Sequence, residues 1–139
     1  MKKLFFFLLA GLSLMISCEP DDPDDSTDDP RDKIENTWRC DENSQVFSTT
    51  TYTVDIKKDA TSEDKVLIYR FYNLGAQKFL KATLNGTSLT ISNQIIDDNI
   101  ISGSGLIMNN FKKIQWTYYV DDGSGVSIDT VSADYIPAY

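Results

Sequence analysis

The chain has 139 residues, 41% of them hydrophobic, and carries a formal charge of −8 at pH 7. This length suits one domain of ordinary size, and its apolar content is sufficient for a core without disulfides or a structural metal. The acidic balance excludes nucleic acid and anionic lipid head groups as partners, since both require clustered Lys and Arg side chains.

The N-terminus predicts a secretory signal peptide over residues 1–17. Lys2 and Lys3 precede a largely apolar segment of thirteen residues, 4–16, which matches the charged and apolar regions of such signals. At about 1.5 Å per helical residue this segment spans roughly 20 Å, which is shorter than the ~30 Å hydrocarbon core of a bilayer. A permanent membrane span is therefore not expected, and an uncleaved signal anchor is the alternative.

The residues Met15-Ile16-Ser17-Cys18 resemble a bacterial lipobox. The resemblance implies that the Cys18 thiol receives a diacylglycerol and that Cys18 becomes the acylated N-terminus after cleavage. This chemistry requires a thiol at the boundary, because the thiolate is the nucleophile. Each buried methylene contributes about 0.8 kcal/mol, so two or three acyl chains hold a protein stably on a membrane. Cys18 is thus the predicted lipid attachment site, and the membrane is a predicted partner.

Residues 18–32 are predicted to form an acidic tether. Residues 19–32 hold eight acidic residues against one Arg, together with three prolines, a composition that stays solvated and repels itself. An acidic run directly after a lipidated Cys resembles the surface-export signal of Bacteroidetes lipoproteins. That resemblance implies a lipid-anchored protein of the outer membrane, exposed on the cell surface. A plain spacer, with the protein facing the periplasm, is the alternative.

Residues 33–139 are predicted to form a single all-β domain. Apolar and polar residues alternate with a period of two, and turn residues recur about every ten residues. The dipeptide Asn85-Gly86 predicts a type I′ hairpin. We expect eight strands, which are centred near Trp38, Val54, Ile68, Ala82, Ile91, Gly105, Thr117 and Val131.

Short connections between these segments favour an up-and-down antiparallel topology. Eight such strands can close into a barrel that holds side chains or one small ligand. A two-sheet β-sandwich is the alternative. Residues 66–72 are apolar on both faces apart from Arg70, so we expect a neighbouring sheet or a partner to cover both sides. Gly103 and Gly105 either leave room for a ligand or mark a bend in their strand.

Two resemblances concern the domain. The stretch Asn36-Thr37-Trp38, after Ile34, resembles the Gly-x-Trp start of lipocalin-like barrels, in which the Trp plugs one end of the barrel. More broadly, the segments TYTVDI, FYNLG, ISGSG and IQWTYYVDDGSG resemble small Bacteroidetes lipoproteins with a lipocalin-like or related β domain, most of which lack an assigned activity. The resemblances imply a fold and carry over no functional residues.

Side chains for catalysis are sparse in this sequence. The absence of His removes imidazole-based triads and typical zinc sites. Cys40 is the second Cys beside Cys18, and we predict that it is buried and structural. The carboxylates at 97–98 and 121–122 fall in predicted turns, where turn preference explains them and calcium binding is the alternative. We predict no enzyme, no cofactor and no metal, although a carboxylate pair brought together in a cleft would favour an enzyme.

Aromatic residues carry the functional prediction. Tyr72 and Tyr119 are expected on the faces opposite Phe71 and Tyr118, which makes them candidate ligand-binding residues, with core packing as the alternative. We predict a lipid-anchored extracytoplasmic binding module for a glycan or a small ligand. The alternative is a protein-interaction module, such as an inhibitor or an assembly subunit of the cell envelope.

Overall fold

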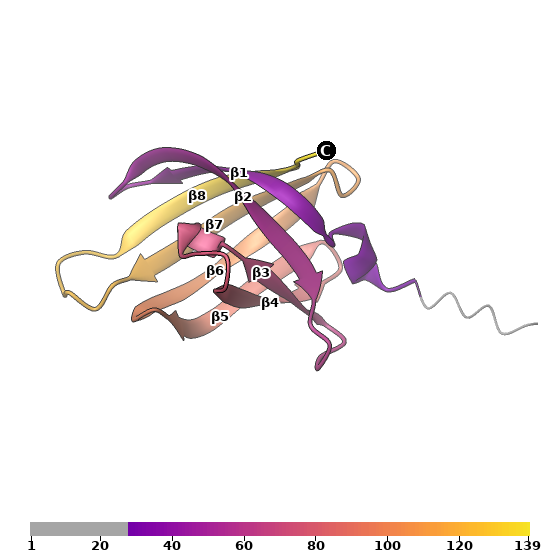
Figure 1. Cartoon of the computed structure of the whole chain (residues 1–139), viewed down its shortest axis with the longest axis horizontal. Coiled ribbons are helices and arrows are strands. Elements are labelled where there is room, and N and C mark those ends of the chain that lie inside the picture. The colour runs from indigo at the N-terminus through magenta and orange to yellow at the C-terminus, as the bar shows by residue number, and fades with distance from the viewer. Residues whose placement is uncertain (1–27) are drawn as a thin grey trace, which may run out of the picture.

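The computed structural model describes residues 28–139, which form a closed barrel of eight antiparallel strands (Figure 1). The predicted signal peptide, Cys18 and the first part of the predicted tether lie outside the described residues. The strands are β1 (Asn36–Ser44), β2 (Ser48–Lys58), β3 (Lys65–Tyr69), β4 (Phe79–Asn85), β5 (Ser88–Ile96), β6 (Asn99–Met108), β7 (Lys113–Asp121) and β8 (Asp129–Pro137). Two short 3-10 helices accompany them, η1 (Pro30–Lys33) and η2 (Phe71–Asn73).

The predicted eight-stranded up-and-down barrel is confirmed. Each strand pairs with its neighbours in chain order, and β1 pairs antiparallel with both β2 and β8. This last pairing closes the sheet and leaves no free edge, so the sandwich alternative is excluded. No helix within residues 28–139 is long and apolar enough to cross a membrane.

The interior of the barrel is filled with side chains from alternate positions of each strand. Strand β7 contributes Trp116 and Tyr118, and the Phe71 ring packs against both, with its centroid 6.2 Å from the Trp116 ring and 4.5 Å from the Tyr118 ring. Gly105 lies opposite Trp116 in β6, and a Cβ atom there would lie 2.7 Å from Cε3 of the indole. A Cβ atom at Gly103 would likewise clash with β7, because it would lie 2.5 Å from the Thr117 carbonyl oxygen. The room that these glycines leave is therefore occupied by β7, not by a ligand.

The hairpin between β4 and β5 differs from the predicted type I′ turn. Asn85 pairs with Ser88, so the two loop residues are Gly86 and Thr87, and Gly86 has a φ angle of +61°. This register places Leu84 and Leu89 opposite each other in the interior. With Asn85-Gly86 at the centre of the turn Leu84 would face Thr87 instead, so the pairing of the two buried leucines outweighs the local preference of Asn-Gly.

Residues 66–72, which we expected to be covered on both faces by a sheet or a partner, are a strand only in their first part. Strand β3 ends at Tyr69, and Arg70 takes a left-handed conformation with a φ angle of 61°. The chain then turns into η2, which points Phe71 into the core. Leu67 and Tyr69 are half exposed on the outer face, and no second sheet covers them within residues 28–139.

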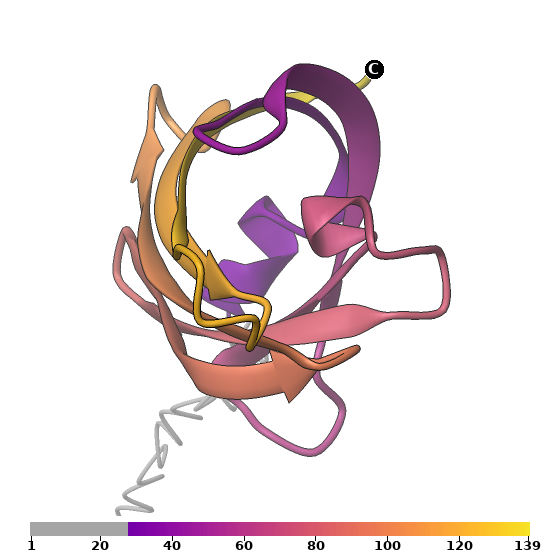
Figure 2. The ribbon, with the colours of Figure 1, turned by 90° about the vertical axis from the view of Figure 1, so that its left-hand side faces the viewer.

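The two ends of the barrel differ. The closed end comprises η1 and the loops 59–64, 86–87 and 109–112; the open end comprises the loops 45–47, 70–78, 97–98 and 122–128. Figure 2 looks into the open end, with η1 at the far end of the barrel. At the closed end the indole Nε1 of Trp38 donates to the Ile34 carbonyl at 2.9 Å. Arg31 Nη1 donates to the carbonyls of Asp59, Ser62 and Lys65.

Helix η1 begins at Pro30, within the stretch predicted as tether. The Asp29 side chain accepts from the backbone N–H of Arg31 at 3.0 Å and so caps the first turn. Pro30 suits the first helical position because its fixed φ is compatible with a helix. Residues 30–32, which lie in the stretch predicted as tether, therefore form part of this helix.

Candidate functional site

A pocket of about 480 Å³ opens at the open end of the barrel. It is walled by the β1–β2 loop, by η2 and the residue after it, and by the loop between β7 and β8. The residues that define it best are Val46, Phe47, Tyr72, Leu74, Val126 and Asp129. Apolar walls over a few polar groups are the usual composition of a small-molecule site, and the volume falls within the range of about 300 to 1,000 Å³.

Apolar side chains form the upper wall of this pocket. Phe47 is 67% exposed and Val126 is 84% exposed, although both belong to residue types that are normally buried. The Phe47 ring stands edge-on to the Tyr72 ring, with centroids 6.2 Å apart and an interplanar angle of 61°. Neither Phe47 nor Val126 is needed to fill the core, so both are free to cover a bound molecule.

Asp129 forms the floor of the pocket and is only 3% exposed. Its carboxylate accepts from Ser44 Oγ at 2.5 Å, from the Tyr72 hydroxyl at 2.7 Å and from the Val46 backbone N–H at 3.2 Å. Ser44 Oγ in turn accepts from the Phe47 backbone N–H at 2.8 Å. These hydrogen bonds fix the β1–β2 loop and η2 around one carboxylate. Every donor is uncharged, and within residues 28–139 no Lys or Arg forms an ion pair with Asp129.

A second acidic side chain lies below this floor, inside the barrel. Glu42 is buried and accepts hydrogen bonds from the hydroxyls of Tyr52 and Tyr118. The Tyr118 ring meets the Tyr72 ring nearly at a right angle, with centroids 6.3 Å apart. Burial raises the pKa of Tyr52, Tyr72 and Tyr118 well above that of free tyrosine. All three hydroxyls therefore keep their protons and act as donors at neutral pH.

The turns with paired carboxylates lie at the rim of the open end. Asp121 Oδ1 accepts from the Gly123 backbone N–H and Asp122 Oδ1 from the Ser124 backbone N–H, both at 2.9 Å. Such bonds are those that make Asp common in turns. Within the described part of the chain no three His, Cys, Asp or Glu side chains converge in a way that could hold a metal ion.

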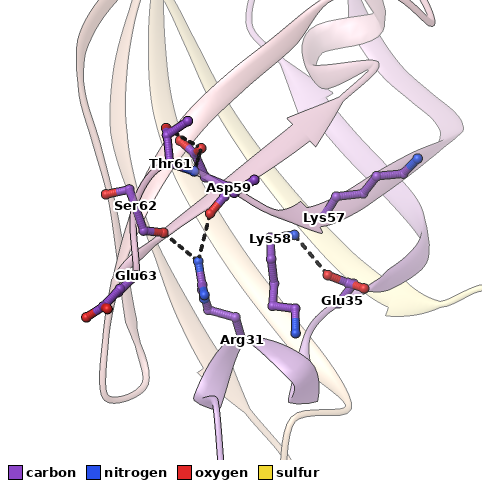
Figure 3. A pocket seen from close by; sticks show the side chains of 9 residues that line it. Arg31, Glu35, Lys57, Lys58, Asp59, Thr61, Ser62 and Glu63 are labelled. Carbon is purple, nitrogen blue, oxygen red and sulfur yellow. Dashed lines mark hydrogen bonds between the residues drawn. The ribbon is translucent and has the colours of Figure 1, made fainter.

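A larger depression of about 670 Å³ lies at the closed end, beside η1 (Figure 3). Several of its polar groups are engaged with one another: Arg31 Nη1 donates to loop carbonyls, and the Lys58 backbone N–H donates to Glu35 Oε2 at 2.9 Å. The Thr61 hydroxyl, with help from Lys81, lowers the pKa of Asp59 to about 2. These contacts join η1 to the β2–β3 loop, so we interpret this depression as structural.

The structure separates the two predicted ligand-binding residues. Tyr72 lines the open-end pocket, whereas Tyr119 is 46% exposed on the outer face of β7, where it pairs with Ser102 and Thr130. Cys18 lies outside the described residues. Cys40 is buried as predicted, and burial raises the pKa of its thiol to about 12, so it is protonated and unreactive.

Sequence reasoning missed Phe47, Val126 and Asp129. Phe47 and Val126 lie in loops, where no periodicity marks them. Asp129 could have been found from the alternation of β8, because it precedes Val131, Ala133 and Tyr135 at intervals of two residues, and all four side chains are buried. A carboxylate at an inward position of a barrel strand indicates a buried polar site.

No family model matches the chain, and no curated protein matches it. Two solved structures share its fold with a TM-score of 0.54 each. One is EF1p2_mFAP2b bound to DFHBI, which is 12% identical, with the match covering 76% of this chain and 94% of that one. The other is a redesigned beta barrel, b11L5F_LGL, which is 8% identical, with 80% and 96% covered. At these identities the likeness concerns the barrel fold alone.

Proposed function

We propose that this protein is a lipid-anchored extracytoplasmic binding protein without catalytic activity, and that the open-end pocket is its ligand site. The observation that carries the proposal is the contrast within that pocket. Exposed apolar side chains, Phe47 and Val126, stand above a buried polar floor made by Asp129 and Tyr72. Apolar walls contribute affinity, and a few fixed polar groups orient the ligand.

The positions of the chain start and of the pocket, at opposite ends of the barrel, fit an anchored protein. The described chain begins at residue 28 beside η1, at the closed end (Figure 1). The pocket lies between the loops of the opposite end. A lipid on Cys18 would therefore hold the closed end nearer to the bilayer. The pocket would face away from the membrane, where it could meet a ligand.

Binding is favoured over catalysis by the state of the two buried acidic residues. Asp129 already accepts from Ser44, Tyr72 and the backbone of Val46, and Glu42 lies beneath it in the filled interior. Catalysis by a pair of carboxylates needs both side chains to reach the substrate, and Glu42 does not line the pocket. A barrel of this fold is also found in EF1p2_mFAP2b bound to DFHBI, which supports the idea that such a barrel can hold a ligand.

The alternative is a protein-interaction or assembly subunit of the cell envelope. Exposed apolar residues on the outer face of the barrel favour it, since Ile95 is 71% exposed and pairs with the exposed Ile100 of β6. Exposed apolar patches on a monomer mark interaction surfaces when they are large and contiguous. This candidate predicts a bound envelope protein whose capture is lost in an Ile95→Asp variant and kept in a Phe47→Ala variant.

Metabolic labelling with a fatty acid tests the anchor. We expect label on the wild-type protein and none on Cys18→Ala, because only a thiol can form the thioether. A Cys40→Ala variant is the matched control and should keep the label. Label on the Cys18→Ala protein would refute the lipobox assignment.

A ligand search with the mature chain carrying Cys18→Ala tests the pocket, since this variant needs no detergent that could occupy the site. NMR amide shifts would locate binding. We expect ligands to shift the amides of the open-end loops 45–47, 70–78 and 122–128. Saturable binding that shifts only amides of the closed end or of the outer face would refute the pocket as the ligand site.

A further inference from the structure

We propose that the open-end pocket selects small organic cations, such as primary amines that carry an aromatic or apolar body. This inference rests on the proposed function, because it assigns a ligand class to the same pocket. Three features of the pocket support it: a buried acidic floor without a basic partner, an acidic rim, and two aromatic side chains in the wall.

The floor lacks a counter-charge. Asp129 is hydrogen-bonded to uncharged donors alone, and Glu42, below it, is bonded to two tyrosine hydroxyls. Within residues 28–139 neither acidic residue forms an ion pair with Lys or Arg. Buried charges in proteins are normally paired, because hydrogen bonds replace water only in part. A cation in the pocket would supply the pairing that the chain does not provide for Asp129.

The rim has the same sign as the floor. The open-end loops and the strand ends next to them carry five acidic residues, Asp97, Asp98, Asp121, Asp122 and Asp129. Their basic residues are Lys78 and Arg70. Lys78 Nζ lies 2.6 Å from Asp97, and Arg70 turns to the outer face, where it contacts Asp55 at 3.4 Å and Thr53 at 2.9 Å.

The open end therefore presents a net negative field. A cleft with low-dielectric walls focuses such a field and raises the local concentration of cations. The same field repels carboxylates, phosphates and sulfated or acidic glycans. Charge thus narrows the ligand class that the proposed function leaves open.

The aromatic wall of the pocket also favours a ligand with an ammonium group. Phe47 and Tyr72 both line the pocket, with their rings 6.2 Å apart and steeply inclined to each other. The face of an aromatic ring attracts an ammonium group, by about 0.5 to 2 kcal/mol depending on desolvation. Leu74 and Val126 extend this wall with apolar surface. The pocket thus offers an acidic group for the ammonium and rings for the body of the same molecule.

The test compares three probes of nearly equal shape on the mature chain carrying Cys18→Ala: 2-phenylethylammonium, 2-phenylethanol and phenylacetate. NMR titration measures the dissociation constant and identifies the shifted amides. We expect the ammonium probe to bind about tenfold tighter than the alcohol and the carboxylate probe not to bind, in line with a cation held by one desolvated acidic group. Raising the salt concentration should weaken ammonium binding and leave alcohol binding unchanged.

Two variants connect the selectivity to the pocket. Asp129→Asn keeps an acceptor for Tyr72 but removes the charge, so the preference for ammonium over alcohol should disappear. Because Asp129 also fixes the β1–β2 loop, Phe47→Ala is a second variant that keeps those hydrogen bonds, and it should weaken ammonium binding about fivefold. Tyr119→Ala, on the outer face, is the control and should bind as the wild type does.

The outcomes separate this inference from the proposed function. If 2-phenylethanol or a neutral methyl glycoside shifts the open-end amides as strongly as the ammonium probe, cation selection is refuted and the pocket remains a ligand site. If the ammonium probe shifts only scattered surface amides without saturation, cation selection is likewise refuted. If no probe, charged, neutral or sugar, shifts the open-end amides at 20 mM, about the weakest affinity a small-fragment site shows, the proposed function fails as well.

Discussion

The closed and open ends of this barrel differ in how their polar and apolar side chains are paired and buried. At the closed end the polar groups satisfy one another: Arg31 donates to three carbonyls of the neighbouring segment, and the Trp38 indole donates to Ile34. At the open end Phe47 stays exposed and Asp129 is buried without a basic partner among the described residues. Folded proteins normally bury large aromatic side chains and pair buried charges.

The difference indicates a division of roles between the ends. Apolar burial and satisfied hydrogen bonds stabilise a fold, and the closed end has both. Exposed apolar surface and uncompensated charge contribute little to stability, which supports the binding role that we propose for the open end. Variants at the closed end should therefore change the free energy of unfolding, and variants at the open end should change binding.

The largest effect is expected at Trp38, which fills the closed end. Trp38→Ala removes a fully buried indole and its hydrogen bond to the Ile34 carbonyl, so the free energy of unfolding should fall by about 3 to 5 kcal/mol. Phe47→Ala is the matched aromatic truncation at the open end and should cost less than about 1 kcal/mol. Denaturant unfolding measures both. Equal losses would contradict the division between the ends.

The second largest loss of stability is expected from replacing Arg31. Arg31→Met keeps the aliphatic part of the side chain but leaves the carbonyls of Asp59, Ser62 and Lys65 without this donor. We expect a loss of about 1 to 3 kcal/mol in the free energy of unfolding. Arg39→Met is the control and should cost less than about 1 kcal/mol, because Arg39 is exposed and, within residues 28–139, forms an ion pair with Asp41 alone, at 3.0 Å. A loss from Arg39→Met as large as that from Arg31→Met would refute the structural role of Arg31.

Most of the fold could be predicted from the sequence because a barrel strand repeats one physical pattern. Ile114, Trp116, Tyr118 and Val120 alternate with polar residues, and all four point inward. Strand identity therefore follows from period alone. Details that depend on contacts between strands could not be predicted. The left-handed turn at Arg70 is an example, because the apolar residues of β3 and η2 form one segment in the sequence apart from Arg70 and predict a single strand.

The candidate site was harder to predict than the fold. Tyr72 was selected for the right type of side chain, but it was placed on a strand, whereas it lies in η2 and bonds to a residue 57 positions away. The pocket exists because closure of the barrel brings the loops 45–47 and 122–128 together. No spacing along the chain encodes that approach. The carboxylate of Asp129, in phase with an apolar strand, was the one available signal.

The closed end should also determine how the protein responds to acid. Hydrogen bonds from Arg31 lower the pKa of Asp29 to about 2, and those from Thr61 lower the pKa of Asp59 to about 2. Both folded-state values lie below the ordinary value near 3.9, so these groups stabilise the fold above pH 4, and the stabilisation is lost as the pH falls from about 4 to about 2.

Unfolding free energies measured between pH 5 and pH 2 check this expectation. Thr61→Val removes the hydroxyl donor to Asp59 and should make the decline shallower. Thr90→Val, an exposed position in β5, should leave the slope unchanged. A wild-type stability that rises between pH 4 and pH 2 would contradict the assignment.

The smallest effects are expected from removing single tyrosine hydroxyls, and they compare the two tyrosines that the sequence proposed for ligand binding. Tyr72→Phe removes the donor to Asp129 and should cost about 0.5 to 1.5 kcal/mol in unfolding free energy, with a change in ligand affinity at the open end. Tyr119→Phe alters an outer-face residue that is 46% exposed, so its change should stay within about 0.5 kcal/mol, with unchanged affinity. If Tyr119→Phe weakened binding and Tyr72→Phe did not, the ligand would lie on the outer face of β7. The two ends of the barrel would then differ in their contribution to stability and not in ligand binding.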